Sequence, residues 1–315
     1  MSNSLFGSIL GFAAITLALA THMIMKSLTN EVDFLMTVFG RFVFSLPLLF
    51  LFAFLVRKRK IFSVNNWYNV FLRSFFGIIT MVPVFLSIQL IPIGLVTALA
   101  QSSAIFVTLL APFFVGEKIG LIRWSAVLVG LFGVYLMTNP IAILMGTSNL
   151  SSLGLTLATS SAITHAGLAL TLRKLGKTEH PTTTALVHNL ITTLIIFVSI
   201  LFYGTSFIGA KGLHGIEIIF HPNLYLYILI LLGVIGSFVQ YLMATSYKYT
   251  DATVLVTIRY LAIPLAAIFG YFIWEEIPTS QQIIGGLFII FSSVIITTRE
   301  IKLNKSKPIE IKNEI

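Results

Sequence analysis

Several polar side chains lie inside long apolar runs of this 315-residue chain, where they need a chemical reason. Arginine is a fixed cation whose planar guanidinium matches a carboxylate or a phosphate. Glutamine and tyrosine donate and accept hydrogen bonds, and histidine can carry a proton near neutral pH. We therefore expect these residues to bind a small solute that bears an anionic group. They are Arg41, Gln101, His165, His188, Gln240, Arg259 and Tyr260.

Each candidate also has a purely structural explanation. A buried arginine can cap backbone carbonyls or pair with an acid, and a histidine can simply be hydrogen bonded inside the protein. Arg41 and Arg259 each lie about eight residues inside a run, hence ~12 Å deep at helical rise, and they approach the centre from opposite faces. Arg73 lies only about five residues inside its run, so we expect its side chain to extend to the nearby surface.

The elements that must position these residues are membrane-spanning helices. Hydrophobic residues make up 57% of the chain and charged residues 10%, against about a quarter charged in soluble domains. Repeated apolar runs reach the ~20 residues that a helix needs to cross a bilayer. The expected fold is therefore an all-α polytopic membrane protein with ten transmembrane helices. The expected spans are 5–25, 34–56, 68–90, 94–115, 121–138, 151–172, 182–203, 224–247, 251–273 and 280–298.

The basic residues predict the orientation of these helices. Fifteen Lys and Arg residues fall in loops and a tail on one side, whereas only Lys26 and Lys211 fall on the other side. Because cytoplasmic loops carry an excess of Lys and Arg, both the N and the C terminus should be cytoplasmic. The basic loops account for the net charge of +9. We therefore expect the partner to be a lipid bilayer and not a nucleic acid.

The second half of the chain resembles the first. A constant shift of 159 residues aligns Gly77 with Gly236 and Glu117 with Glu276. Five spans per half is an odd number, so the second half must enter the membrane inverted, as in many secondary transporters. The alternative is that the halves are not a true repeat, because any ten spans can be divided into five and five. We expect repeats at residues 1–140 and 150–299, followed by a basic cytoplasmic tail at 300–315.

Two stretches carry a resemblance to a known family. They are GEKIGLIRWSAVLVGLFGVYLM at 116–137 and YTDATVLVTIRYLAIPLAAIFGYFIWEEIPTSQQIIGG at 249–286. Together with the span pattern they resemble the EamA-like branch of the drug/metabolite transporter (DMT) superfamily. The resemblance implies a secondary carrier of small metabolites, with family acids at Glu117 and Glu276. The stretch from Asp251 to Tyr260 also resembles that of relatives that import S-adenosylmethionine.

We therefore expect a permease in the cytoplasmic (inner) membrane that moves a small metabolite, such as an amino acid, by alternating access. An importer or exchanger of S-adenosylmethionine or a similar nucleoside metabolite is the alternative. An intramembrane enzyme is disfavoured because no HExxH or GxSxG pattern is present, and a non-transporting scaffold would not require deep arginines. We expect no cofactor and no metal. The small-residue stripe Ala262, Ala266 and Gly270 would suit packing within the chain or a homodimer.

Overall fold

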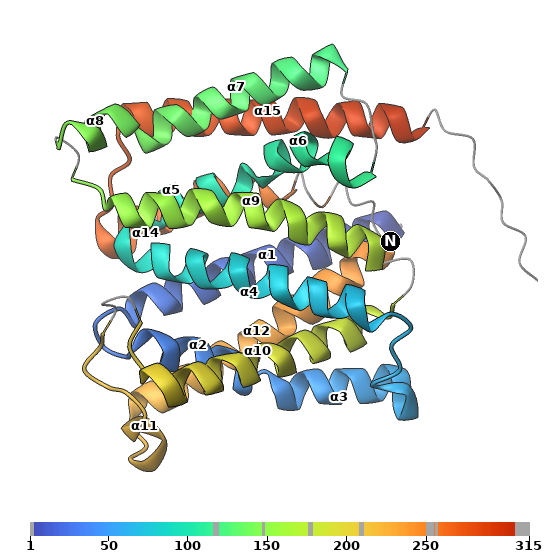
Figure 1. Ribbon diagram of the computed structural model, residues 1–315, viewed down its shortest axis with the longest axis vertical. Helices are drawn as coiled ribbons and strands as arrows, with labels where there is room; N and C mark the ends of the chain where they lie inside the picture. Colours follow the sequence, from blue (N-terminus) through green and yellow to red (C-terminus); the bar gives the residue numbers. More distant parts are fainter. Residues whose placement is uncertain are drawn as a thin grey trace, which may run out of the picture.

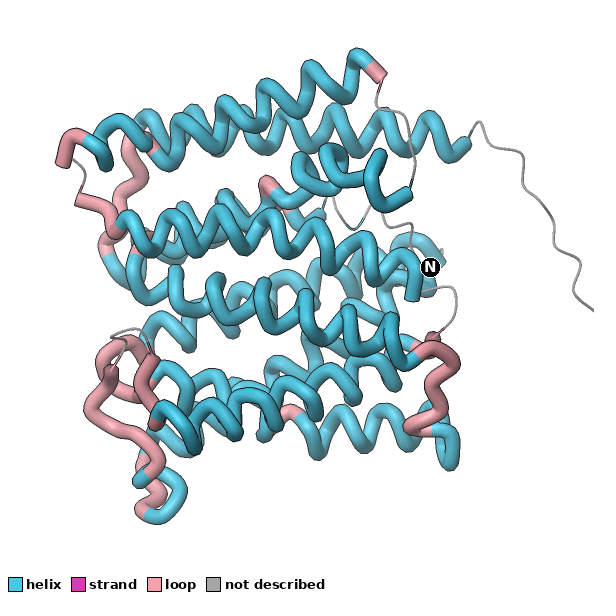
Figure 2. Tube along the Cα trace, in the orientation of Figure 1, coloured by secondary structure: helices cyan, strands magenta, loops and turns pink. Residues whose placement is uncertain are grey.

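The computed structural model is a bundle of roughly antiparallel helices joined at two ends (Figure 1). It describes residues 3–115, 120–146, 149–175, 179–207, 211–249, 255 and 258–305, and within these ranges every regular element is a helix (Figure 2). The helices are α1 (Asn3–Ser27), α2 (Phe34–Val43), α3 (Leu46–Arg57), η1 (Lys58–Lys60), α4 (Trp67–Leu90), α5 (Ile93–Gln101), α6 (Ser103–Val115), α7 (Leu121–Thr138), α8 (Pro140–Leu144), α9 (Ser152–Leu175), α10 (Pro181–Tyr203), α11 (Glu217–Phe220), α12 (Leu224–Tyr249), α14 (Ala262–Trp274) and α15 (Ser280–Lys305).

Nine of the described helical segments are long and apolar enough to cross a membrane. The shorter apolar helix α14 lies in the expected ninth span, whose first part lies largely outside the described residues. The expectation of a polytopic helical membrane protein is therefore confirmed. The number ten and the cytoplasmic position of both termini stay predictions.

Three of the expected spans are broken near their middle. Proline lacks an N–H group and its ring clashes with the carbonyl four residues earlier, so Pro47 breaks the helix at Ser45, between α2 and α3. The hydroxyl of Ser45 donates to the side-chain oxygen of Asn189 on α10, 2.8 Å away. Pro264 acts in the same way on the turn before α14. The third break separates α5 from α6 at Ser102, whose hydroxyl donates to the Leu99 carbonyl at 2.6 Å.

The helices pair across the two halves of the sequence. Helix α1 packs along α12, α4 along α9, and α7 along α15, while α5 packs against α14. Helix α2 contacts both α10 and α12, and α10 also contacts α4. In Figure 1, α7 and α15 form one side of the bundle, and α3, α10 and α12 form the opposite side. Segments far apart in sequence therefore surround the middle of the bundle together.

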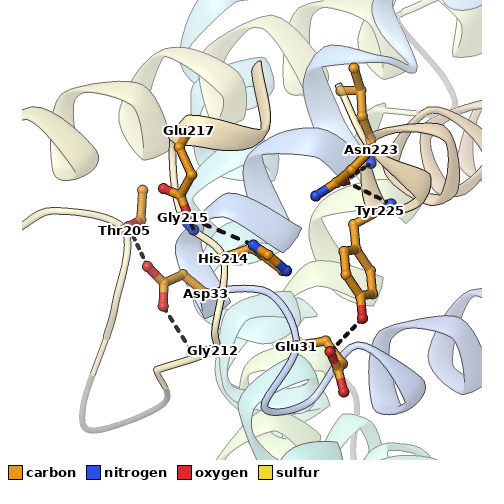
Figure 3. Close-up of polar contacts among 10 residues, drawn as sticks. Glu31, Asp33, Thr205, Gly212, His214, Gly215, Glu217, Asn223 and Tyr225 are labelled. Carbon is orange, nitrogen blue, oxygen red and sulfur yellow. Dashed lines mark hydrogen bonds and ion pairs between the residues drawn. The ribbon is translucent and has the colours of Figure 1, made fainter. Parts of the chain in front are cut away.

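The connection between α10 and α12 is ordered where the structure describes it. Asp33 accepts hydrogen bonds from the Thr205 hydroxyl and from the Gly212 backbone N–H, the latter at 2.8 Å (Figure 3). The Tyr225 hydroxyl donates to Glu31 at 2.5 Å. These contacts fasten the connection to the turn between α1 and α2. We call this side of the molecule the Asp33 end.

An acid also fastens a loop at the other end of the bundle. Glu179, which precedes α10, accepts backbone hydrogen bonds from Asn65 and Asn66 at 2.7–3.1 Å. Asn66 is the residue that caps α4 with its side chain. Each acid thus holds a connection that belongs to the other half of the chain. We call this side the Glu179 end.

Candidate functional site

Arg41 lies deep in the bundle on α2, with 3% of its surface exposed. Its Nε and Nη1 atoms have no hydrogen-bond partner among the described residues. The ion pairs recorded in the described part of the chain, Lys26 with Glu276 and His214 with Glu217, do not involve it. The Phe42 ring lies 5.4 Å from its Cζ atom. Arg41 is therefore a buried cation with donors left over for another molecule.

Two glycines make room for the central polar groups. A Cβ atom on Gly236 of α12 would overlap the guanidinium of Arg41. A Cβ atom on Gly77 of α4 would come within 2.5 Å of the His188 ring. Arg41 and His188 thus occupy equivalent notches, each formed by a glycine of the other half of the chain. The shift of 159 residues that aligned these two glycines in the sequence was the one signal for this arrangement.

His188 lies on α10 with 2% of its surface exposed. Its Nδ1 lies 3.4 Å from the Thr192 hydroxyl, and its ring meets the Phe42 ring edge to face at 6.0 Å. Arg41 and Arg73 are both within electrostatic range of this ring. The structure therefore brings Arg41 and His188 together, as two of the predicted site residues.

Arg73 is partly exposed, so the expectation that its side chain extends to the surface stays a prediction. Its Nε and Nη1 atoms are buried and have no hydrogen-bond partner among the described residues. Gly77 follows one helical turn later on α4, so the guanidinium shares the His188 side of that helix. Helix α4 is surrounded by α1, α9 and α10, which buries these two atoms.

Gln240 belongs to the same cluster through α12. It follows Gly236 by four residues, so both lie on one face of the helix. Its Nε2 atom is buried without a partner among the described residues. His22 on α1 is also within electrostatic range of Arg41 and packs against the Phe85 ring at 5.9 Å. Sequence reasoning had named Gln240 but had given His22 and Arg73 no binding role. We call Arg41, Arg73, His188 and Gln240 the central cluster.

A second polar pair is formed by Arg259 and His165. The Arg259 Nη2 atom lies 3.3 Å from the His165 Nε2 atom, so a neutral histidine can accept a hydrogen bond from it. Next to His165, Thr164 accepts a hydrogen bond from Thr80 at 3.0 Å, which holds α9 to α4. Within the described residues, no recorded hydrogen bond joins this pair to the central cluster. The predicted site residues therefore fall into two groups.

The remaining candidates, Gln101 and Tyr260, mark the breaks in two helices. Gln101 is the last residue of α5 and is half-buried. Tyr260 lies in the turn before α14 and packs into the core with 6% of its surface exposed. Unlike the central cluster, both residues lie at helix breaks, where backbone carbonyls lack their usual partners within the helix.

Glu276 has a structural position at the Asp33 end. Its carboxylate accepts a hydrogen bond from the Ile93 backbone N–H at 2.9 Å and pairs with Lys26. Lys26 also donates to the Ile91 carbonyl at 3.2 Å. The acid therefore caps α5 and ties it to the end of α1. The matching family acid, Glu117, lies outside the described residues.

A cavity of about 380 Å³ lies elsewhere in the protein. Its wall is apolar apart from Glu276 and Gln282, and it is formed mainly by residues of α5, α14 and α15. No residue of the central cluster lines it. The cavity offers no cation for an anion to bind. In the part of the chain that the structure describes, no group of His, Asp and Glu is arranged to hold a metal ion.

Several proteins of similar sequence are named as transporters or exporters of small molecules. The S-adenosylmethionine uptake transporter of Rickettsia bellii (strain RML369-C) is 25% identical over 91% of this chain and 92% of its own length. The Pseudopaline exporter CntI of Pseudomonas aeruginosa (strain UCBPP-PA14) is 24% identical over 70% of this chain and 72% of its own. The riboflavin transporter of Vibrio cholerae (El Tor Inaba N16961) is 26% identical over 68% and 66%.

A solved structure supports the fold and a family model supports the family, each over nearly the whole chain. A crystal structure with 17% sequence identity superposes with a TM-score of 0.61 and covers 95% of this chain and 99% of that chain. This likeness concerns the fold alone. The model of the EamA-like transporter family matches residues 5–139 and 152–298. The chain therefore belongs to the EamA-like transporter family.

Proposed function

We propose that this protein is a secondary transporter that moves a small metabolite bearing a carboxylate or another anionic group by alternating access. The observation that carries the proposal is Arg41, a buried guanidinium with donors unused by the described residues. A buried cation without a partner is costly. A transient anionic partner would offset that cost, which supports a solute site at the central cluster.

The helix contacts support two inverted five-helix repeats. Helices α1 and α12 are the first and eighth expected spans, and they pack together. Exchanging each span for its counterpart in the other half gives the sixth and third spans, α9 and α4, which also pack together. The same operation converts the α2 and α12 contact into the α10 and α4 contact. Arg41 is the eighth residue of α2, and His188 is the eighth residue of α10. We infer ten spans, repeats at 1–140 and 150–299, and both termini in the cytoplasm, as in transporters that rock one repeat against the other.

The breaks at Gln101 and Tyr260 support a transport path in the same region. Discontinuous helices near the membrane midplane expose backbone groups to bound solutes in many transporters. Arg259 and His165, next to one of these breaks, form a second position for a polar part of the solute. The small-residue stripe of Ala262, Ala266 and Gly270 is buried within the chain, so it supports intrachain packing more than a homodimer.

The second candidate solute is S-adenosylmethionine or a similar nucleoside metabolite. A relative named for uptake of that compound aligns over 91% of this chain. Such a solute would place its carboxylate on an arginine of the central cluster and a polar edge near Arg259. Because relatives named as transporters come from bacteria, we propose the cytoplasmic (inner) membrane as the location.

Counterflow in proteoliposomes tests the proposal. Purified protein is reconstituted, and radiolabelled amino acids, dicarboxylates and S-adenosylmethionine are exchanged against the same unlabelled solute. We expect at least one of these solutes to exchange, and Arg41→Gln to abolish that exchange. Arg59→Gln is the matched control, because it removes the same charge from an exposed residue of η1. Lack of exchange by every solute, or equal exchange by the Arg41→Gln protein, would refute the anionic-metabolite proposal.

A further inference from the structure

We propose that the central cluster binds a solute with two anionic groups, such as a short dicarboxylate, with one group on Arg41 and the other on Arg73. The inference rests on the proposed transport function and names the substrate class of that site. It starts from the four buried guanidinium nitrogens, Nε and Nη1 of both arginines, that find no partner among the described residues.

The charges argue for two negative groups. Arginine stays protonated at physiological pH, so the cluster carries two fixed positive charges. The polar residues around them, His188, Gln240 and Thr192, contribute no carboxylate. No carboxylate of the described residues forms a recorded ion pair with either arginine. A monoanion would therefore leave one of the two arginines without a counter-charge, whereas a dianion would neutralise both.

The helix geometry argues for two separated anionic groups. Arg41 is the eighth residue of α2, counted from the Asp33 end, and Arg73 is the seventh residue of α4, counted from the Glu179 end. At ~1.5 Å per residue their backbones lie about 12 Å and about 10 Å from opposite ends, which leaves roughly 8 Å between their levels in a ~30 Å membrane core. The two arginines therefore approach the cluster from opposite ends of the core. Two carboxylates on a short linker would match that arrangement.

The middle of the cluster suits the linker. His188 lies within electrostatic range of both arginines, and the Phe42 ring packs against both His188 and Arg41. Gln240 adds an unpartnered Nε2 donor near Arg41. A linker of a few carbon atoms would thus meet an aromatic ring and neutral hydrogen-bonding groups. The two glycine notches bring the backbone of α4 close to His188 and that of α12 close to Arg41.

Calorimetric titration of the detergent-purified protein tests the inference. The probes are succinate, glutarate and adipate, each compared with the monocarboxylate of equal length, namely butyrate, pentanoate and hexanoate, at pH 7.5. We expect at least one dicarboxylate to bind at least tenfold more tightly than its monocarboxylate, since a hydrogen bond to a charged group changes affinity by roughly ten- to a hundredfold. This comparison needs no variant and so does not depend on the folding of a mutant.

Variants then assign the two positions. Arg41→Gln and Arg73→Gln should each bring the dicarboxylate down to the affinity of its monocarboxylate, whereas Arg41→Lys should keep part of the preference and Arg59→Gln all of it. Equal binding of both classes, no binding of either, or a preference that survives both glutamine variants would overturn the inference. If a monoanionic solute is still transported in proteoliposomes, the proposed function stands without it. If no anionic solute is transported, both fail.

Discussion

Replacing Gly236 by alanine would test the position of the Arg41 side chain with little change in the stability of the bundle. The added methyl group would occupy the space of the Arg41 guanidinium. That guanidinium is the far end of a flexible side chain, so it can swing away without moving the backbone. Alanine also favours a helix by about 1 kcal/mol over glycine, which offsets part of the crowding. We expect the free energy of unfolding to change by less than about 1 kcal/mol.

The function should respond much more strongly than the stability. A displaced guanidinium loses its charge-assisted hydrogen bonds to the solute, which are worth about 1.5–3 kcal/mol. Solute affinity, measured by counterflow or calorimetry, should therefore fall by roughly ten- to a hundredfold. The melting temperature of the same preparation should remain close to that of the native protein.

Two further glycines provide controls for this experiment. A Cβ atom on Gly286 of α15 meets only the Met137 side chain at 4.0 Å, so Gly286→Ala should leave the affinity unchanged and raise the free energy of unfolding by up to about 1 kcal/mol. On α12 itself, a Cβ atom on Gly233 would lie 2.7 Å from the backbone carbon of Phe44, which cannot swing away. Gly233→Ala should therefore cost about 1–3 kcal/mol of stability. If Gly236→Ala binds solute as well as the native protein does, Arg41 is not the binding group.

Three other predictions follow from single contacts. Gly77→Ala should displace the His188 ring and reduce transport, as measured by counterflow, with the Gly286→Ala protein again as control. Glu276→Ala removes the acceptor that caps α5 and should lower stability by about 1 kcal/mol in thermal unfolding; an unchanged melting temperature would contradict the capping role. The backbone N–H of Gly215 holds the pKa of Glu217 below its ordinary value, so the contact stabilises the loop above that value and is lost as pH falls through the lowered pKa. Protection of the Gly215 amide against hydrogen exchange, relative to its intrinsic rate at each pH, should therefore fall in that acid range, and in Glu217→Ala it should be low at every pH.

The sequence by itself predicted the class of fold, because the requirement that a bilayer places on a helix can be recognised in a short stretch of sequence. A span must present about 20 apolar residues, and such runs can be recognised without knowing their neighbours. Prolines such as Pro47 and Pro264 act on their own helices, so helix breaks near them could also be anticipated. Arg41 and His188 could be named as candidates because ionisable groups inside apolar runs are costly anywhere.

Only the tertiary structure decided which of these groups meet. Arg41 and His188 are far apart in sequence, and no periodicity tells which face of one helix turns toward the other. Arg73 looked close to a surface when depth was counted along the chain, and it is partly exposed, yet its Nε and Nη1 atoms are buried by neighbouring helices. Arg259 was predicted as a binding residue, but its contact with His165 depends on how α9 packs. Local chemistry thus determined which residues are costly in a membrane, and helix packing determined which of them share one site.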